Sequence, residues 1–134
     1  MSVEVVMRAL LNVSGITSIV GANLAMIKLP QGAGYPALVW EPVSEVPEPP
    51  IDAEALGQMT RSRVQVTALA RTAAAVVSLH AAVRSALEFS SGSIAGVQVV
   101  AVTREFAGPY DNDETAKVFS RPVDYMVLHY DPTV

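Results

Sequence analysis

The sequence predicts an α+β protein built around a mainly antiparallel sheet of about four or five strands. In residues 61–68, Arg63, Gln65 and Thr67 alternate with apolar residues, the period-2 pattern of a strand with one buried face. From Thr72 onwards the apolar residues recur at helical spacing instead. Strand-like segments follow one another directly on both sides of this unit, and such runs favour a sheet with helices on one face. We predict an N-terminal helix and one long helix on that face.

The long helix is predicted over residues 72–89. Its apolar stripe comprises Val76, His80, Val83 and Leu87, flanked by Ala73 and Val77. These residues fall at the spacing of one face of a helix with 3.6 residues per turn. His80 therefore belongs to the stripe, and we expect it to be a packing residue rather than a catalytic base.

The remaining helices and strands are predicted from the same two patterns, the 3.6-residue repeat of a helix and the two-residue alternation of a strand. A first amphipathic helix is predicted over 3–13, followed by a short second turn that ends at Gly21, a typical C-cap residue. The other strands are predicted over 36–44, 94–106 and 117–130.

Three details of these strands can be predicted. Pro42 lacks a backbone donor, which places its strand at an edge or at a bulge. The third strand is expected to present Val97, Val99, Ala101 and Thr103 on one face. In the last strand, Phe119, Val123, Tyr125 and Val127 share one face, and Met126 and Leu128 on the other predict burial on both sides.

A proline-rich, acidic segment at 46–59 interrupts the strands. Its prolines exclude a continuous sheet, and a loop of this length in a compact domain is usually functional or mobile. We predict a single domain, residues 1–134, with an arm that projects at about 45–60. Its candidate contact residues are Glu48, Ile51 and Leu56.

Composition excludes several classes of protein. Apolar residues make up 51% of the chain and charged residues 16%, which favours burial over disorder; a surface covered by other subunits and a compact monomer both fit. The net charge of −4 argues against a dedicated nucleic-acid binder.

The absence of cysteine excludes disulfides and thiol chemistry, and the N-terminus has no signal-peptide pattern. Residues 9–27 carry no charge, but Gly15 and Gly21 interrupt them, so we predict no membrane span.

No catalytic or metal-binding set is apparent, and we expect no cofactor. His80 and His129 stand at unrelated positions without cysteine. The run Asp111–Glu114 lacks the central glycine and distal glutamate of a calcium loop, so an exposed acidic turn is favoured. Arg61 and Arg63 share a strand face that fits either a solvated surface or a site for a phosphate or a partner's carboxylates.

Three segments together resemble the tail-completion, or tail-terminator, proteins of long-tailed bacteriophages, prophages and gene-transfer particles. The first, residues 9–44, contains a helix, a Val-Gly turn, Leu-Pro-Gln-Gly and Pro-Ala-Leu-Val-Trp. The second, residues 63–87, has an Arg-Val-Gln-Val strand and a helix ending in Ala-Val-Arg-Ser-Ala-Leu. The third, residues 110–130, pairs an acidic turn with a terminal strand containing Asp-Tyr.

The resemblance implies a structural protein without enzymatic activity. Such proteins form a ring, typically a hexamer, that caps the head-proximal end of the tail tube, stops its polymerisation and joins it to the head connector. The implied partners are copies of itself, the tube protein and the connector, with DNA as cargo and no membrane. The implied location is the virion tail, assembled in the bacterial cytoplasm. Candidate contacts outside the arm are Arg61, Arg63, Gln65, Tyr110, Asp111 and Asp113.

Two other functions remain open at this point. One is a small cytoplasmic module that binds a ligand or acts as an enzyme, with Arg61, Arg63 or His80 in a cleft. The other is a neighbouring head–tail joining protein of the same particle.

Overall fold

The computed structural model describes residues 2–47 and 58–131. The helices are α1 (Ser2–Leu11), α2 (Ser14–Val20) and α3 (Ala73–Leu87). The strands are β1 (Leu24–Met26), β2 (Ala37–Pro47), β3 (Gln58–Ala70), β4 (Gly92–Ile94), β5 (Val97–Ala107), β6 (Asp111–Asp113) and β7 (Val118–Asp131).

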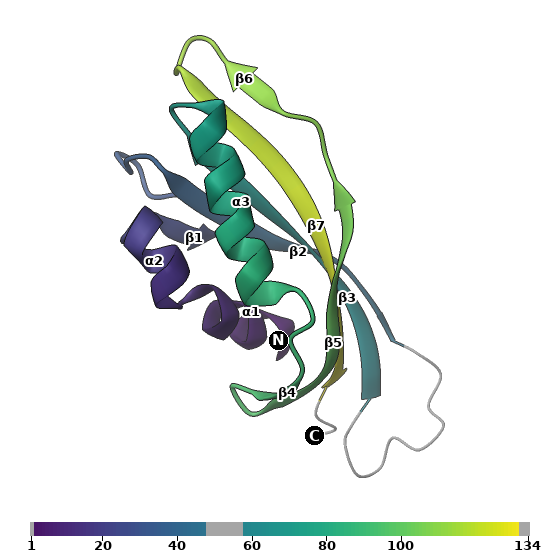
Figure 1. Cartoon of the computed structure of the whole chain (residues 1–134). Helices are drawn as coiled ribbons and strands as arrows, with labels where there is room; N and C mark the ends of the chain where they lie inside the picture. The colour runs from purple at the N-terminus through teal and green to yellow at the C-terminus, as the bar shows by residue number, and fades with distance from the viewer. Residues whose placement is uncertain (1, 48–57, 132–134) are drawn as a thin grey trace.

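The strands form one curled sheet, and the helices lie on one side of it (Figure 1). The strand order is β1-β2-β3-β7-β5-β4, and β6 pairs with the first part of β7. All pairs are antiparallel except β1 with β2. The predicted α+β class with a mainly antiparallel sheet is thus confirmed. We call the sheet surface under the helices the covered face and the opposite surface the open face.

The expected number of strands is wrong, because the described residues form a sheet of seven strands. The additional strands, among them β4 and β6, have three residues each, which is too short for alternation to be visible in the sequence. The N-terminal part likewise contains two helices rather than one, since α2 is a separate helix that ends at Gly21. Gly21 has φ +60 and donates its N–H to the Thr17 carbonyl, as expected of a residue that ends a helix.

Helix α3 packs across the covered face and begins at Thr72, whose hydroxyl accepts the Ala75 N–H at 3.1 Å. The predicted stripe is wrong at one position. The buried residues of α3 are Val76, Leu79, Val83 and Leu87. His80 is half-buried at the margin of this stripe, because offsets of three and four are equivalent on a helix and only the packing selects between them.

The covered face of the sheet supplies the other half of the core. On β3, Val64 and Val66 are fully buried, and β7 places Tyr125 and Val123 directly opposite them. From α1 and α2, Met7, Leu11 and Ile16 pack into the same cluster. On the open face of β7, Asp124 is buried whereas Met126 and Leu128 are half-buried, so the predicted burial on both sides holds at Asp124 and only in part at the other two.

Bulges change the faces of two strands. The β2–β3 register shifts between Pro42 and Ser44, which confirms the irregularity predicted from the proline. The β5–β7 register shifts between Val99 and Ala101 and again between Arg104 and Phe106. A one-residue insertion reverses the side-chain alternation, so the buried residues of β5 are Val97, Val99 and Val102. The expected single face ending at Thr103 is therefore wrong.

The predicted arm falls mostly outside the described residues, which exclude 48–57. Residues 46–47 and 58–59, expected to belong to the arm, are the ends of β2 and β3.

Among the described helices, none alone is long and apolar enough to cross a membrane, whereas α1 and α2 taken as a bent pair, at 75°, pass by length and composition. Their apolar residues Val3, Val6, Leu11, Ile16 and Val20 are at most 3% exposed within the core.

Candidate interaction surface

The open face carries the strand residues predicted to meet a partner. The register aligns its residues in rows across β2, β3, β7 and β5. One row is Glu41, Gln65, Asp124 and Phe106, and the next is Ser44, Arg63, Met126 and Thr103. A third row is Val46, Arg61, Leu128 and Ala101. The structure therefore brings Arg61, Arg63 and Gln65 together on one helix-free face.

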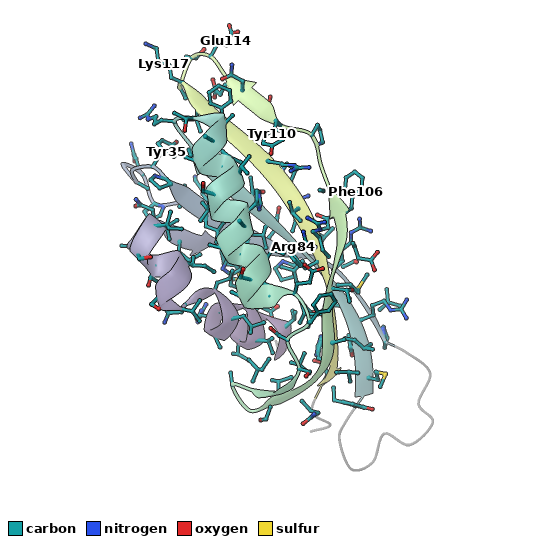
Figure 2. All side chains as sticks on the ribbon, in the orientation of Figure 1. Tyr35, Arg84, Phe106, Tyr110, Glu114 and Lys117 are labelled. Atoms are coloured by element: carbon teal, nitrogen blue, oxygen red, sulfur yellow. The ribbon has the colours of Figure 1, made fainter. Side chains whose placement is uncertain are left out.

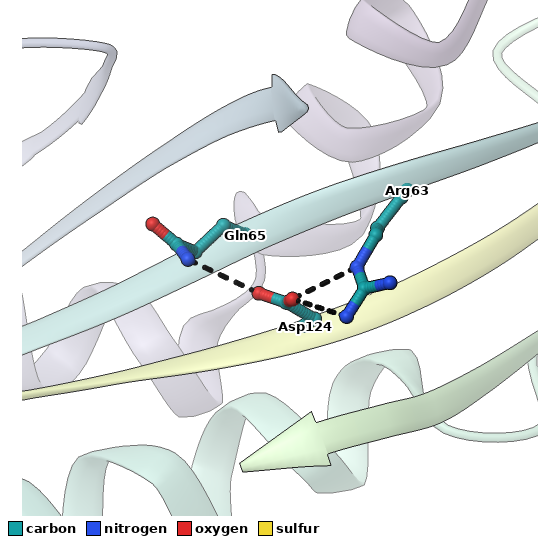
Figure 3. Close-up of polar contacts among 3 residues, drawn as sticks. All are labelled: Arg63, Gln65 and Asp124. Carbon is teal, nitrogen blue, oxygen red and sulfur yellow. Dashed lines mark hydrogen bonds and ion pairs between the residues drawn. The ribbon is translucent and has the colours of Figure 1, made fainter. Parts of the chain in front are cut away.

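Arg63, Gln65 and Asp124 form a closed polar cluster in the middle of this face (Figure 3). Arg63 donates through Nε to Asp124 Oδ2 at 2.9 Å, and its second guanidinium nitrogen lies 2.8 Å from the same oxygen. Gln65 Nε2 donates to Asp124 Oδ1 at 3.2 Å. Both carboxylate oxygens are thus bonded although the Asp124 residue is only 7% exposed. A charge this buried costs free energy unless it is paired, so the cluster fixes Arg63 on the sheet.

Asp124 was not among the sequence-based candidates. Its signal was an acidic residue inside the otherwise apolar run of β7, but the sequence does not show which residue of β3 lies beside it. The register Gln65↔Asp124 supplies that information.

The exposed apolar residues of the open face lie at its margins. Val46 is 54% exposed at the end of β2, and Phe106 is 56% exposed on β5. Figure 2 shows Phe106 on β5, pointing away from the helices. The face therefore combines an internally paired polar centre with uncovered apolar side chains, a composition that fits a surface on which another protein docks.

The other predicted contacts form a separate site on the β6–β7 hairpin. Asp111 pairs with Ser120, four residues before Asp124 along β7, so Tyr110, Asp111 and Asp113 do not join the polar cluster. Asp113 Oδ1 accepts the N–H groups of Thr115 and Ala116, both at 3.1 Å. The acidic residues here order a turn, in agreement with the exposed acidic turn favoured over a calcium loop.

Two arginines hold the hairpin in place. Arg121 lies over the Tyr110 ring at 4.6 Å and donates to the Gly108 carbonyl at 2.9 Å. Arg71 lies over the Tyr35 ring at 4.9 Å and donates to the Ala116 carbonyl at 2.6 Å. Arg121 belongs to β7, so its contacts brace the hairpin itself, whereas Arg71 precedes α3 and fixes the hairpin to the body of the protein.

A serine, a histidine and an aspartate meet at the other end of the sheet, which the sequence did not reveal. Ser62 Oγ is 2.7 Å from His129 Nε2, and His129 Nδ1 is 3.5 Å from Asp131 Oδ1. The Asp131 carboxylate can only accept, so we assign the proton to Nδ1. Thr60 also donates to Asp131 Oδ2 at 2.7 Å. The residue types, and the chain of contacts from serine through histidine to aspartate, match those of a nucleophilic triad.

The burial of Ser62 and His129 distinguishes this network from a catalytic triad. Ser62 and His129 are fully buried on the covered face, so a substrate has no access to the hydroxyl in this structure. Burial lowers the pKa of the His129 imidazole, against the opposing effect of Asp131, Glu45 and Glu4. The network thus serves to satisfy polar groups inside the sheet layer.

His80 lies on the helix side of the sheet. Its Nε2 is 2.7 Å from the Arg121 carbonyl, which can only accept, and its buried Nδ1 has no hydrogen-bond partner in the described part of the chain. Burial is the main cause that lowers the pKa of His80. Arg63 and His80 therefore lie on opposite sides of the sheet and do not share a cleft. Within residues 2–47 and 58–131, no three metal-binding side chains converge.

The candidates Glu48, Ile51 and Leu56 lie outside the described residues.

Comparisons with known proteins agree with the resemblance. The family model for the tail completion protein gp17 matches residues 4–130. A chain in the virion of a native gene transfer agent particle aligns with a TM-score of 0.68 and 14% identity, covering 96% of this chain and 93% of that chain. A second solved chain aligns with a TM-score of 0.63 and 14% identity, covering 100% and 99%. No curated protein matches the sequence. At this identity the two structural likenesses concern the fold, whereas the family match confirms the resemblance.

Proposed function

The chain belongs to the tail completion protein gp17 family, and we propose that it forms a ring that ends the tail tube of a phage-like particle. Membership makes it a structural component of the virion tail. The ring would cap the head-proximal end of the tube, stop polymerisation and join the tail to the head connector. The family match over nearly the whole chain carries this proposal. Six copies are expected from the resemblance.

The open face supports an assembly role. A closed ring needs two different, complementary surfaces on each subunit. The open face, with its paired centre and the uncovered Phe106 and Val46, lies on the side of the sheet away from the helices. The hairpin at Tyr110–Lys117 is a second exposed feature. A net charge of −4 also suits a lumen through which DNA slides, because like charge keeps DNA from adhering.

The segment between β2 and β3 is proposed to contribute to docking through Glu48, Ile51 and Leu56. Pro47 and Thr60 are register partners, so a short glycine-containing turn can replace residues 48–57 and still join the two strands. This shortened variant tests the segment while keeping the sheet.

The experiment mixes the purified protein with tail tubes assembled from their tube protein and images them by negative-stain microscopy. We expect ring-shaped density at one end of each tube, with further growth blocked, and weaker capping by the shortened variant. Density at an end already occupied by a terminator would instead identify a head–tail joining protein. A protein that remains monomeric at high concentration and binds no tube end would disprove the proposal.

A further inference from the structure

A small pocket lies between α1 and the β1 edge of the sheet, apart from the open face. Its volume is about 250 Å³, and it is lined by Arg8, Asn12, Leu24, Ala25, Met26 and Trp40. Sites for drug-sized ligands usually measure about 300–1,000 Å³. The pocket is below that range and suits a protein side chain or loop tip better than a cofactor.

The chemistry of the pocket selects an acidic occupant. Trp40, only 3% exposed, and the partly buried Leu24 provide an apolar floor. Arg8 is exposed at the rim and has no ion-pair partner among the described residues, and the Asn12 side chain adds an amide. A guanidinium beside an amide, above an apolar floor, binds a carboxylate on a short apolar stem.

The β6–β7 hairpin carries such a carboxylate. Asp111 and Asp113 already accept backbone N–H groups of their own turn. Glu114, at the tip in Figure 2, is exposed and makes no hydrogen bond or ion pair within the described parts of the chain. The tip carries three carboxylates against the single ammonium of Lys117, so it is complementary to Arg8.

The hairpin is also rigid enough to dock without large ordering costs. The Arg71 contacts to Tyr35 and Ala116 fix one side, and the turn around Asp113 fixes the other. Preorganisation of this kind preserves binding free energy, because little conformational freedom is lost on association.

The pocket and the tip cannot meet within one subunit. The tip lies beyond the N-terminal end of α3, where Arg71 contacts it, whereas α1 packs near the other end of that helix (Figure 1). A contact between them must join two copies, and head-to-tail repetition of such a contact is the heterologous arrangement that closes a ring.

We infer that Glu114 at the hairpin tip of one copy enters the Arg8–Trp40 pocket of the next copy. This inference rests on the proposed ring and identifies one of its contacts. Glu114 pairs with Arg8, Asn12 donates to the same carboxylate, and the turn covers Trp40. The contact gives the ring its direction, since the tip and the pocket face opposite neighbours.

A charge swap tests the contact. Arg8→Glu and Glu114→Arg are each expected to raise the apparent dissociation constant of assembly about tenfold or more, because each places like charges together. The double variant R8E/E114R is expected to recover to within about threefold of the wild type. Arg8→Gln, which removes charge without reversing it, should have a smaller effect. Sedimentation velocity over a concentration series measures these constants.

A mismatched pair is the control. Arg104 is another exposed arginine without an ion pair among the described residues, so R104E/E114R reverses the same number of charges and should not recover. Unchanged thermal melting of each variant shows that folding is intact. Trp40 is the single tryptophan of the chain, so its emission should change on assembly of the wild type and not with R8E.

The outcomes separate this inference from the proposed function. A wild type that forms rings and caps tubes, together with single variants that assemble normally or a mismatched pair that recovers equally well, overturns the tip–pocket contact alone. A wild type that neither assembles nor caps tubes overturns both.

Discussion

The two faces of the sheet are built from the same strands but differ in what completes them. On β3, Ser62, Val64 and Val66 are fully buried under the helices, whereas Arg63 and Gln65, between them in sequence, are half-covered on the open face. The covered face is completed within the chain by apolar packing. The open face pairs its polar residues through Asp124 and leaves apolar residues such as Phe106 uncovered. One face therefore supplies stability, and the other is the surface that we propose for a partner.

The covered face should give the largest effect on stability. Leu79 of α3 is fully buried, so Leu79→Ala is expected to lower the free energy of unfolding by about 2–5 kcal/mol through lost burial and the cavity left behind. Val77→Ala is the matched control, because Val77 is 52% exposed on the same helix, and its change should stay within about 0.5 kcal/mol. Urea unfolding measures both. Similar losses for the two variants would show that α3 does not pack as described.

The alternation that distinguishes the two faces was readable on β3 because no bulge interrupts its pairing with β7. On β5 two bulges reverse the alternation, and a local pattern carries no sign of them. On α3, the choice between Leu79 and His80 depends on which side faces the sheet, since both lie within reach of the stripe. Periodicity thus predicts where the helices and strands lie, and tertiary packing determines which of their residues face the core.

The candidate sites likewise divide into residues that local periodicity predicts and residues that only the tertiary structure brings together. Arg61, Arg63 and Gln65 were predictable as a shared face, because period 2 is a local property. Asp124, 59 residues from Gln65, and His129, 67 residues from Ser62, enter only through strand register, which a single sequence does not specify. The β1-edge pocket was also missed, since it depends on how α1 lies against Trp40.

The two histidines of the helix side, His129 buried and His80 half-buried, should make stability depend on pH. Burial lowers the pKa of His129 and of His80, so the unfolded chain binds protons before the folded chain does as the pH falls. The stability that the two neutral histidines contribute is fully present above their pKa in the unfolded chain, about 6.5. As the pH falls below this value, the free energy of unfolding decreases by up to about 1.4 kcal/mol per pH unit for each histidine. His129→Gln should reduce the slope of the unfolding free energy against pH in the range below about pH 6.5. Urea unfolding across this range provides the test, and an unchanged slope in the variant would rule out His129 as a source.

The open face should give the smallest effect on stability and a clear effect on assembly. Phe106 is 56% exposed, so Phe106→Ser is expected to change the free energy of unfolding by no more than about 0.5 kcal/mol, while the concentration needed for assembly rises because apolar contact area is lost. Val77→Ser is the matched control, since Val77 is 52% exposed but lies on the outer side of α3. Unfolding in urea and sedimentation velocity measure the two quantities on the same samples. If Val77→Ser weakens assembly and Phe106→Ser does not, the helix layer rather than the open face meets the neighbouring subunit, and the two faces exchange the roles assigned to them here.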